Sequence, residues 1–114
     1  MSTITTHVLD TSRGRPASGV PVLLEVQDAG GKWRAIGQGV TDDDGRLRDL
    51  LPSGYQLASG VYRLTFNTAT YFSSRGEDSF YPEVPVVFSV RDTSQHFHVP
   101  LLLSPYGYST YRGS

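Results

Sequence analysis

The sequence predicts an all-β domain in which two sheets pack across one apolar layer. Twelve glycines and seven prolines are spread along the 114 residues and divide them into apolar runs of strand length. Within these runs, apolar and polar residues alternate with a period of two, the pattern of a half-buried strand. Residues 69–79 lack this alternation, and Tyr71, Phe72 and Arg75 in that segment have helix-compatible spacing. We therefore expect one short helix there.

The apolar runs predict seven strands, with ends placed to within about 2 to 4 residues. In chain order they lie near residues 4–10, 20–28, 32–41, 60–68, 84–92, 95–104 and 108–112, with a weak additional strand near 50–52. Residues that favour turns separate them: Gly30 and Gly31 after the second run, Asp43 to Gly45 after the third, and residues 91–94 before the sixth.

The alternation also predicts which side chains form the core. One face of the fifth run carries only apolar side chains, as does one face of the sixth. These residues are Val84, Val86, Phe88 and Val90, then Phe97, Val99, Leu101 and Leu103. Tyr62, Leu64 and Phe66 repeat the pattern in the fourth run. His96 and His98 fall on the opposite face, so we expect them outside the core.

Composition limits the function classes. With 38% hydrophobic and 18% charged residues, the chain has the makeup of one soluble domain spanning residues 1–114. A formal net charge of −1 provides no broad electrostatic footprint for nucleic acid or anionic membranes. The absence of cysteine excludes a thiol nucleophile and a disulfide framework. No apolar stretch approaches the roughly 20 residues of a membrane span. Residues 1–6 lack the pattern of a secretory signal, so we expect a cytoplasmic location.

Three histidines are the candidates for acid–base chemistry. Two of them, His96 and His98, are two residues apart in a strand, which places both side chains on one face. That arrangement suits paired acid–base groups or two metal ligands, but it also fits surface imidazoles with a structural role. A zinc site with three imidazoles would require His7 beside this pair, and nothing in the sequence alone places it there. The less favoured zinc interpretation therefore depends on the tertiary fold.

Two further segments carry polar groups of interest. Residues 42–45, Asp-Asp-Asp-Gly, resemble the opening of a calcium loop, but they lack its alternate spacing and closing glutamate, so we interpret them as a turn. Arg46 follows immediately and could hold carbonyl or anionic oxygens in two-point contacts, or could simply be solvated. Residues 104–114 are dense in aromatic and hydroxyl groups, which indicates either a binding role or a final edge strand.

Several motifs together resemble one family, the 5-hydroxyisourate hydrolases, which are transthyretin-related enzymes of urate breakdown. The resemblance covers nearly the whole chain, and the motifs occur in the family's order. They are Thr6-His7-Val8-Leu9-Asp10, Gly14-Arg15-Pro16-Ala17, Thr41 to Arg46, Phe80-Tyr81-Pro82-Glu83, His96 to Pro105 and Tyr108 to Ser114.

The resemblance implies a transthyretin-like (prealbumin-like) β-sandwich of two four-stranded sheets with one short helix. It implies a homotetramer, a dimer of dimers, with active sites at the dimer–dimer interface on the outer face of a sheet. The implied substrate is 5-hydroxyisourate, hydrolysed to 2-oxo-4-hydroxy-4-carboxy-5-ureidoimidazoline without a cofactor or metal.

The resemblance also implies site residues. His7, Arg46 and His98 correspond to the catalytic positions, and Tyr111 and Ser114 join His7 and Arg46 in substrate binding. His96 matches the family pattern without an assigned role. Phe97 stands where the family often has tyrosine, on the predicted core face.

Two non-catalytic interpretations remain as alternatives. One is a prealbumin-like binding or adhesion module, because segments such as Gly19-Val20-Pro21-Val22 recur in such modules. The other is a hormone-type carrier with the same fold. Carriers of thyroid hormone lack the histidine pair and the terminal Tyr-Arg-Gly-Ser, which favours the enzyme.

Overall fold

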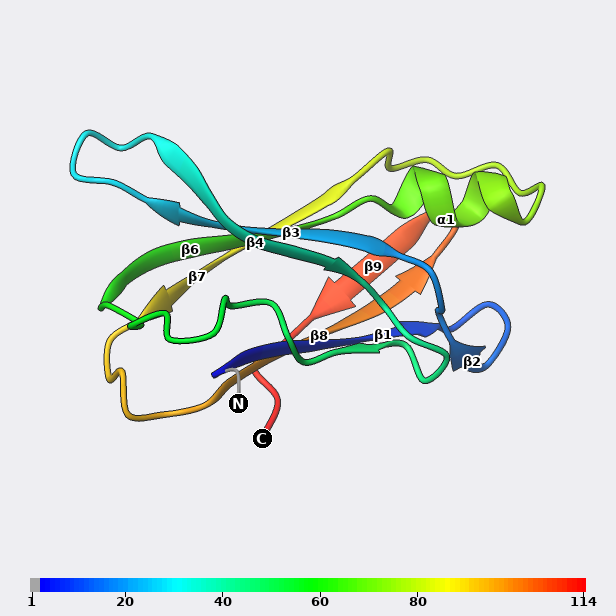
Figure 1. Ribbon diagram of the computed structural model, residues 1–114. Helices are drawn as coiled ribbons and strands as arrows, with labels where there is room; N and C mark the ends of the chain where they lie inside the picture. The colour runs from blue at the N-terminus through cyan, green and yellow to red at the C-terminus, as the bar shows by residue number, and fades with distance from the viewer. Residues whose placement is uncertain (1–2) are drawn as a thin grey trace.

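A computed structural model describes residues 3–114 and shows two β-sheets that face each other, with one short helix at one end (Figure 1). Met1 and Ser2, the first residues of the segment interpreted as lacking a secretory signal, lie outside the described residues. Within residues 3–114, no helix is long and apolar enough to cross a membrane.

The first sheet carries the two predicted histidine segments. Its strand order is β2 (Arg15–Pro16), β1 (Ile4–Asp10), β8 (Phe97–Ser104) and β9 (Gly107–Thr110), and β5 (Arg46–Leu47) also pairs with β1. β1 and β8 run parallel, whereas the other pairs are antiparallel. The beginning and the end of the chain therefore form adjacent central strands.

The second sheet is a four-stranded antiparallel sheet. Its order is β4 (Trp33–Val40), β3 (Pro21–Gln27), β6 (Gly60–Phe66) and β7 (Val84–Val90). All seven strands expected from alternation are present, with ends within two residues of the expected ones. The predicted sandwich of two sheets is thus confirmed. The two-residue strands β2 and β5, which alternation did not predict, both belong to the first sheet, which has five strands and not four.

The core lies between the sheets, as the alternation predicts. Tyr62, Leu64 and Phe66 are each fully buried, and the apolar faces of β7 and β8 are buried except for Phe88, which is half-buried and packs against them. Val87, on the opposite face of β7, is 58% exposed. Burying each large apolar side chain contributes roughly 1.5 to 3 kcal/mol, so this layer is the main source of stability.

Helix α1 (Thr68–Ser74) confirms the predicted helix but is shorter than residues 69–79. It begins where the side chain of Asn67 accepts a hydrogen bond from the backbone of Thr70. It ends where Gly76 adopts a positive φ of 71° and the Glu77 N–H returns to the carbonyl of Phe72. The glycine at position 76 therefore explains why the helix ends before residue 79.

The weak strand expected near residues 50–52 is wrong. Leu50 is buried, and its carbonyl lies so close to Gly37 of β4 that a Cβ at that glycine would collide with it. This segment therefore packs across β4 rather than pairing with an edge. Leu50 and Leu51 are apolar because they pack against the core, and not because they belong to a strand.

A tight turn positions β5 beside β1. The side chain of Asp42 accepts hydrogen bonds from the backbone N–H groups of Asp44 and Arg46, and these bonds lower the pKa of its carboxyl. Gly45 has a φ of 73°, and its carbonyl accepts from the N–H of Val8 at 2.7 Å. A Cβ at Gly45 would lie 2.3 Å from the Val8 carbonyl, so only glycine lets the turn approach β1 this closely.

Candidate active site

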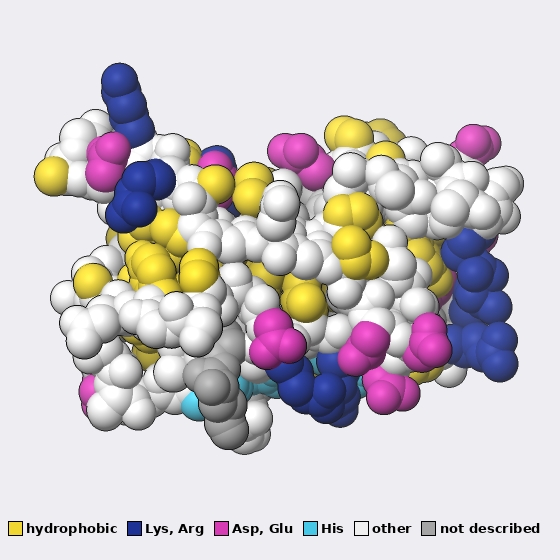
Figure 2. Space-filling view, viewed as in Figure 1, with side chains coloured by type: hydrophobic (Ala, Val, Ile, Leu, Met, Phe, Trp, Pro, Cys, Tyr) yellow, Lys and Arg dark blue, Asp and Glu magenta, His cyan; other side chains and the backbone are white. Residues whose placement is uncertain are grey.

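The outer face of the first sheet brings together polar side chains from three strands. His7 on β1 stands directly opposite Arg46 on β5, and Thr5 on β1 stands beside His98 on β8. His96 lies just before β8, on the same face as His98. Figure 2 shows histidine side chains next to Lys and Arg side chains on this part of the molecule, with acidic side chains nearby. Segments from both ends of the chain thus share one polar surface.

A cavity of about 430 Å³ opens on this surface. It is large enough for a small heterocycle and is lined by imidazoles, guanidinium groups and hydroxyls. The lining residues are Thr5, Thr6, Arg46, Arg48, Asp49, His96, His98 and Ser114. Three of the five predicted site residues therefore line one cavity: Arg46, His98 and Ser114.

His7 lies next to the cavity, and its proton arrangement follows from its partner. Its Nε2 is 2.8 Å from the backbone carbonyl oxygen of Asp44. A carbonyl can only accept, so Nε2 carries the hydrogen and donates it. In the neutral ring the lone pair is then on Nδ1. The turn that presents Arg46 consequently also fixes the tautomer of His7.

The surroundings of His98 favour the neutral form of its ring. Its half-buried position lowers its pKa below the ordinary value of about 6.5, and the nearby charges of Arg46, His7 and His96 lower it further. Its Nδ1 contacts the Thr5 hydroxyl at 2.8 Å, whereas its Nε2 has no hydrogen-bond partner among residues 3–114. A neutral imidazole with one free nitrogen is suited to accept a proton.

Arg46 offers an unengaged cation. Its guanidinium forms no ion pair or hydrogen bond within residues 3–114, although its backbone is held by Asp42. Arg48 supplies a second positive charge to the cavity lining, and Asp49 supplies a negative one. The site is therefore suited to an oxygen-rich ligand that can take two-point contacts from a planar guanidinium.

The segment after β9 closes one side of the site. Gly113 pairs with His98, with its N–H donating to the His98 carbonyl at 2.8 Å. Arg112 holds this segment in place because its guanidinium donates to Gln95 at 2.7 Å and lies 4.7 Å from the centre of the Phe97 ring. These contacts bring Ser114 to the cavity.

The chain does not bring Tyr111 to this cavity. It is 57% exposed and lines a different hollow, beside Phe97, Val99 and Arg112. The neighbouring pairing of Gly113 with His98 directs Ser114 to the site and leaves Tyr111 outside it. The structure thus separates two residues of the terminal segment that the sequence interpretation grouped together.

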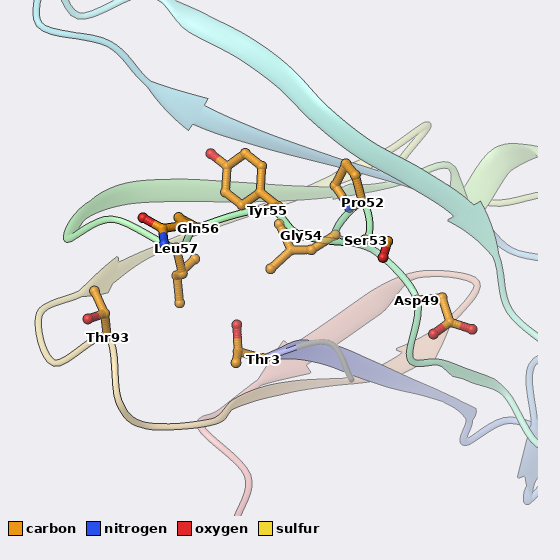
Figure 3. A pocket seen from close by; sticks show the side chains of 10 residues that line it. Thr3, Asp49, Pro52, Ser53, Gly54, Tyr55, Gln56, Leu57 and Thr93 are labelled. Atoms are coloured by element: carbon orange, nitrogen blue, oxygen red, sulfur yellow. The ribbon is translucent and has the colours of Figure 1, made fainter.

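A larger cavity of about 770 Å³ lies next to this site, beneath the loop that precedes β6 (Figure 3). Tyr55, Gln56 and Leu57 lie on the loop side, and Thr3 and Thr93 lie across from them. Among residues 3–114, no histidine or arginine lines this cavity, and Asp49 is the one carboxylate in its lining. Size alone does not make it the reactive site, because it lacks a group that exchanges protons near neutral pH.

A shared metal site does not form among the described residues. Within residues 3–114, no group of three or more His, Cys, Asp or Glu side chains is arranged to hold a metal ion. The Nε2 of His7 donates to a carbonyl, and the facing nitrogens of His96 and His98 contact Thr5. The three-imidazole zinc alternative therefore has no assembled ligand set in this part of the chain.

Comparison with known proteins identifies the family of this chain. The model of the HIUase/Transthyretin family matches residues 4–113. The chain belongs to this family. The 5-hydroxyisourate hydrolase of Salmonella dublin is 50% identical over 111 residues, which cover 97% of this chain and 80% of that protein.

Solved structures of the HIUase/Transthyretin family show that hydrolases and transthyretins share this fold, so the fold alone does not distinguish them. The Klebsiella pneumoniae 5-hydroxyisourate hydrolase superposes with a TM-score of 0.83 at 35% identity, covering 97% of this chain and 98% of that one. Sea bream transthyretin in complex with thyroxine gives a TM-score of 0.91 at 33% identity, covering 97% and 94%. The site residues, and not the backbone, must decide between enzyme and carrier.

The sequence interpretation missed Thr5, the side chain that contacts both members of the histidine pair. Its position two residues before His7 on one strand already indicates the same outer face. Arg48 and Asp49 were also missed. They follow a two-residue strand that alternation is too short to reveal.

Proposed function

We propose that this protein is a 5-hydroxyisourate hydrolase of urate catabolism. The observation that carries the proposal is the single cavity in which Arg46, His98 and Ser114 meet, with His7 beside it. Hydrolases at about 50% identity over nearly the whole chain support the same activity. The product is 2-oxo-4-hydroxy-4-carboxy-5-ureidoimidazoline.

The proposed mechanism is attack of water on a ring carbonyl of the substrate. His98 takes the proton from that water on Nε2, a step worth about 10² to 10⁴ in rate. Arg46 holds ring oxygens and stabilises the negative charge that develops on the attacked carbonyl. His7, whose Nε2 donates to Asp44, orients the water or the substrate from the β1 side. Ser114 binds the substrate at the edge of the cavity. This mechanism uses no cofactor.

We propose that the protein assembles as a homotetramer, a dimer of dimers, in the cytoplasm. The cavity is on the outer face of a sheet, where a second copy could cover it, and β7 and β9 are edge strands. Large apolar side chains are exposed at Val40, Phe80, Val87, Tyr106, Tyr108 and Tyr111. Because Tyr111 is outside the cavity of its own protomer, its substrate-binding role requires contact across a subunit interface.

A decay assay tests the activity. 5-Hydroxyisourate is generated in place by urate oxidase, and its disappearance is followed with and without the purified protein. We expect rapid decay that a metal chelator does not change. Decay at the spontaneous rate would exclude the hydrolase and favour a hormone-type carrier or a binding module.

The pH dependence of kcat/KM should report the lowered pKa of His98. The neutral ring is the active form, so activity is lost as the pH falls through this pKa. Because the pKa lies below about 6.5, we expect more than half of the plateau activity at pH 6.5. The free energy of unfolding should also decrease as the pH falls below about 6.5, because the unfolded chain then binds the proton more readily. A midpoint above 6.5 would contradict this assignment.

Gly113→Ala should impair catalysis without unfolding the protein. A Cβ at this position would lie 2.7 Å from the His98 ring and 3.2 Å from Pro100, so the ring or the segment must move. Misplacing a reacting group in this way costs about 10-fold or more in kcat. Gly107→Ala is the matched control, because its Cβ would have no neighbour closer than 3.7 Å. Equal rates for both variants would show that the position of Gly113 is unimportant.

A further inference from the structure

The Thr5 hydroxyl connects the two histidines of the β8 segment. Its Oγ1 is 3.0 Å from Nε2 of His96 and 2.8 Å from Nδ1 of His98. Thr5 is only 9% exposed, and the two rings lie nearly parallel, 18° apart, on either side of its hydroxyl. Of this histidine pair, the proposed mechanism uses only His98, and it gives neither Thr5 nor His96 a role.

The chemistry of a hydroxyl couples the two rings. A hydroxyl has one hydrogen to donate and accepts through its lone pairs. With both rings neutral, the hydroxyl can donate to only one of the two ring nitrogens, and in the arrangement that uses this hydrogen the other ring nitrogen donates to Thr5. When Nδ1 of His98 donates, Nε2 of His98 has a free lone pair. When Nδ1 accepts, Nε2 carries the hydrogen instead. In this arrangement, the state of His96 determines which nitrogen of His98 is basic.

We propose that Thr5 and His96 are positioning residues that form a proton relay between His98 and solvent. The inference rests on the proposed hydrolase function. In the resting state, Nδ1–H of His98 donates to Thr5, and Thr5 donates to Nε2 of His96. This order leaves Nε2 of His98 unprotonated and able to accept a proton from the attacking water.

The relay conserves protons at each step. The water O–H bond breaks and an Nε2–H bond forms on His98. The Nδ1 proton of His98 passes to the Thr5 oxygen, and the original Thr5 proton passes to Nε2 of His96. His96 then releases its Nδ1 proton to solvent. His98 ends neutral with its hydrogen on Nε2, where it can donate to the leaving nitrogen of the opened ring. The reverse shift restores the resting state.

The surroundings of His98 disfavour a positive charge on its ring. His96 is exposed, whereas His98 is half-buried and faces the positive charge of Arg46 and the ring of His7. Around the same cavity, Arg48 adds positive charge and Asp49 adds negative charge. Arg112 contacts the backbone carbonyl of His96 at 3.4 Å. Burial therefore disfavours the charged ring at His98, whereas the exposed ring of His96 lies next to solvent, which can take the proton.

Nitrogen NMR of the histidine rings in the substrate-free protein tests the coupling. In the wild type we expect His98 protonated on Nδ1 and His96 also protonated on Nδ1 at neutral pH. Thr5→Val keeps the shape of the side chain but removes the hydroxyl, so both rings should shift toward the Nε2–H form. Thr5→Ser should retain the wild-type tautomers. Thr68→Val is the matched control, because it removes a buried hydroxyl that donates to the Tyr81 carbonyl, and neither residue lines the cavity.

Kinetics of the same variants supply the second measurement. For Thr5→Val we expect kcat to fall about 10-fold or more with little change in KM, and Thr5→Ser should restore most of it. Unchanged tautomers in Thr5→Val, or an equal loss of kcat in Thr5→Ser, would overturn the relay. The NMR result does not depend on activity. Coupled tautomers in a protein that leaves 5-hydroxyisourate intact would support the pairing of the rings but overturn the relay as a catalytic device, along with the proposed function.

Discussion

His98→Asn is expected to lower kcat for 5-hydroxyisourate by about 10² to 10⁴, the contribution of a well-placed general base. The lone pair of a neutral imidazole accepts a proton near neutral pH, and no atom of asparagine does so. The amide can still bond to the Thr5 hydroxyl, which contacts His98 at 2.8 Å. The fold should therefore persist while the proton transfer is lost.

The expected loss must be separated from unfolding. Thermal unfolding of His98→Asn should match that of the wild type closely, since the ring is half-buried on the outer face and not in the core. Folded protein with a rate within twofold of the wild type would exclude His98 as the base. His7 would then be the remaining candidate, through its Nδ1.

Arg46→Lys should lower kcat/KM by about 10² even though the charge is kept. A planar guanidinium can contact two oxygens at once, whereas an ammonium is a compact point charge. Because the guanidinium of Arg46 has no partner among residues 3–114, the substitution removes no internal bond, and stability should hardly change. The kcat/KM of the variant is obtained from the decay of 5-hydroxyisourate measured over a range of substrate concentrations.

An exposed arginine provides the control. Arg15→Lys changes the same group on β2, at the far end of β1 and outside the cavity, and its kinetics should equal those of the wild type. Equal kinetics for Arg46→Lys would show that the charge alone suffices and would reject two-point holding of the substrate.

Much of the sandwich could be predicted from local pattern. Alternation identified the buried faces of β7 and β8, and for the same reason it placed His98 on the outer face, where the structure has it. A period of two is a property of the strand itself, so it can be read without knowing the neighbours. The helix was predicted from another local pattern, the lack of alternation and the helix-compatible spacing in residues 69–79, although Gly76 ends it early.

The pairing of distant segments could not be predicted from such patterns. His7 meets Arg46 because a two-residue strand, β5, pairs with β1, and two residues are too few to show alternation. Thr5 meets His98 because β1 and β8 run parallel, although they are separated by most of the chain. The resemblance to the family supplied the residues, and only the fold shows that Tyr111 lies apart from the others in one protomer.

The most direct test is a crystal structure of the protein with a stable urate-like heterocycle that it cannot hydrolyse. We expect the ligand in the 430 Å³ cavity, with the guanidinium of Arg46 on its ring oxygens and Nε2 of His98 facing the site of attack. A ligand bound instead beneath the loop of Tyr55, with His98 and Arg46 free, would contradict it.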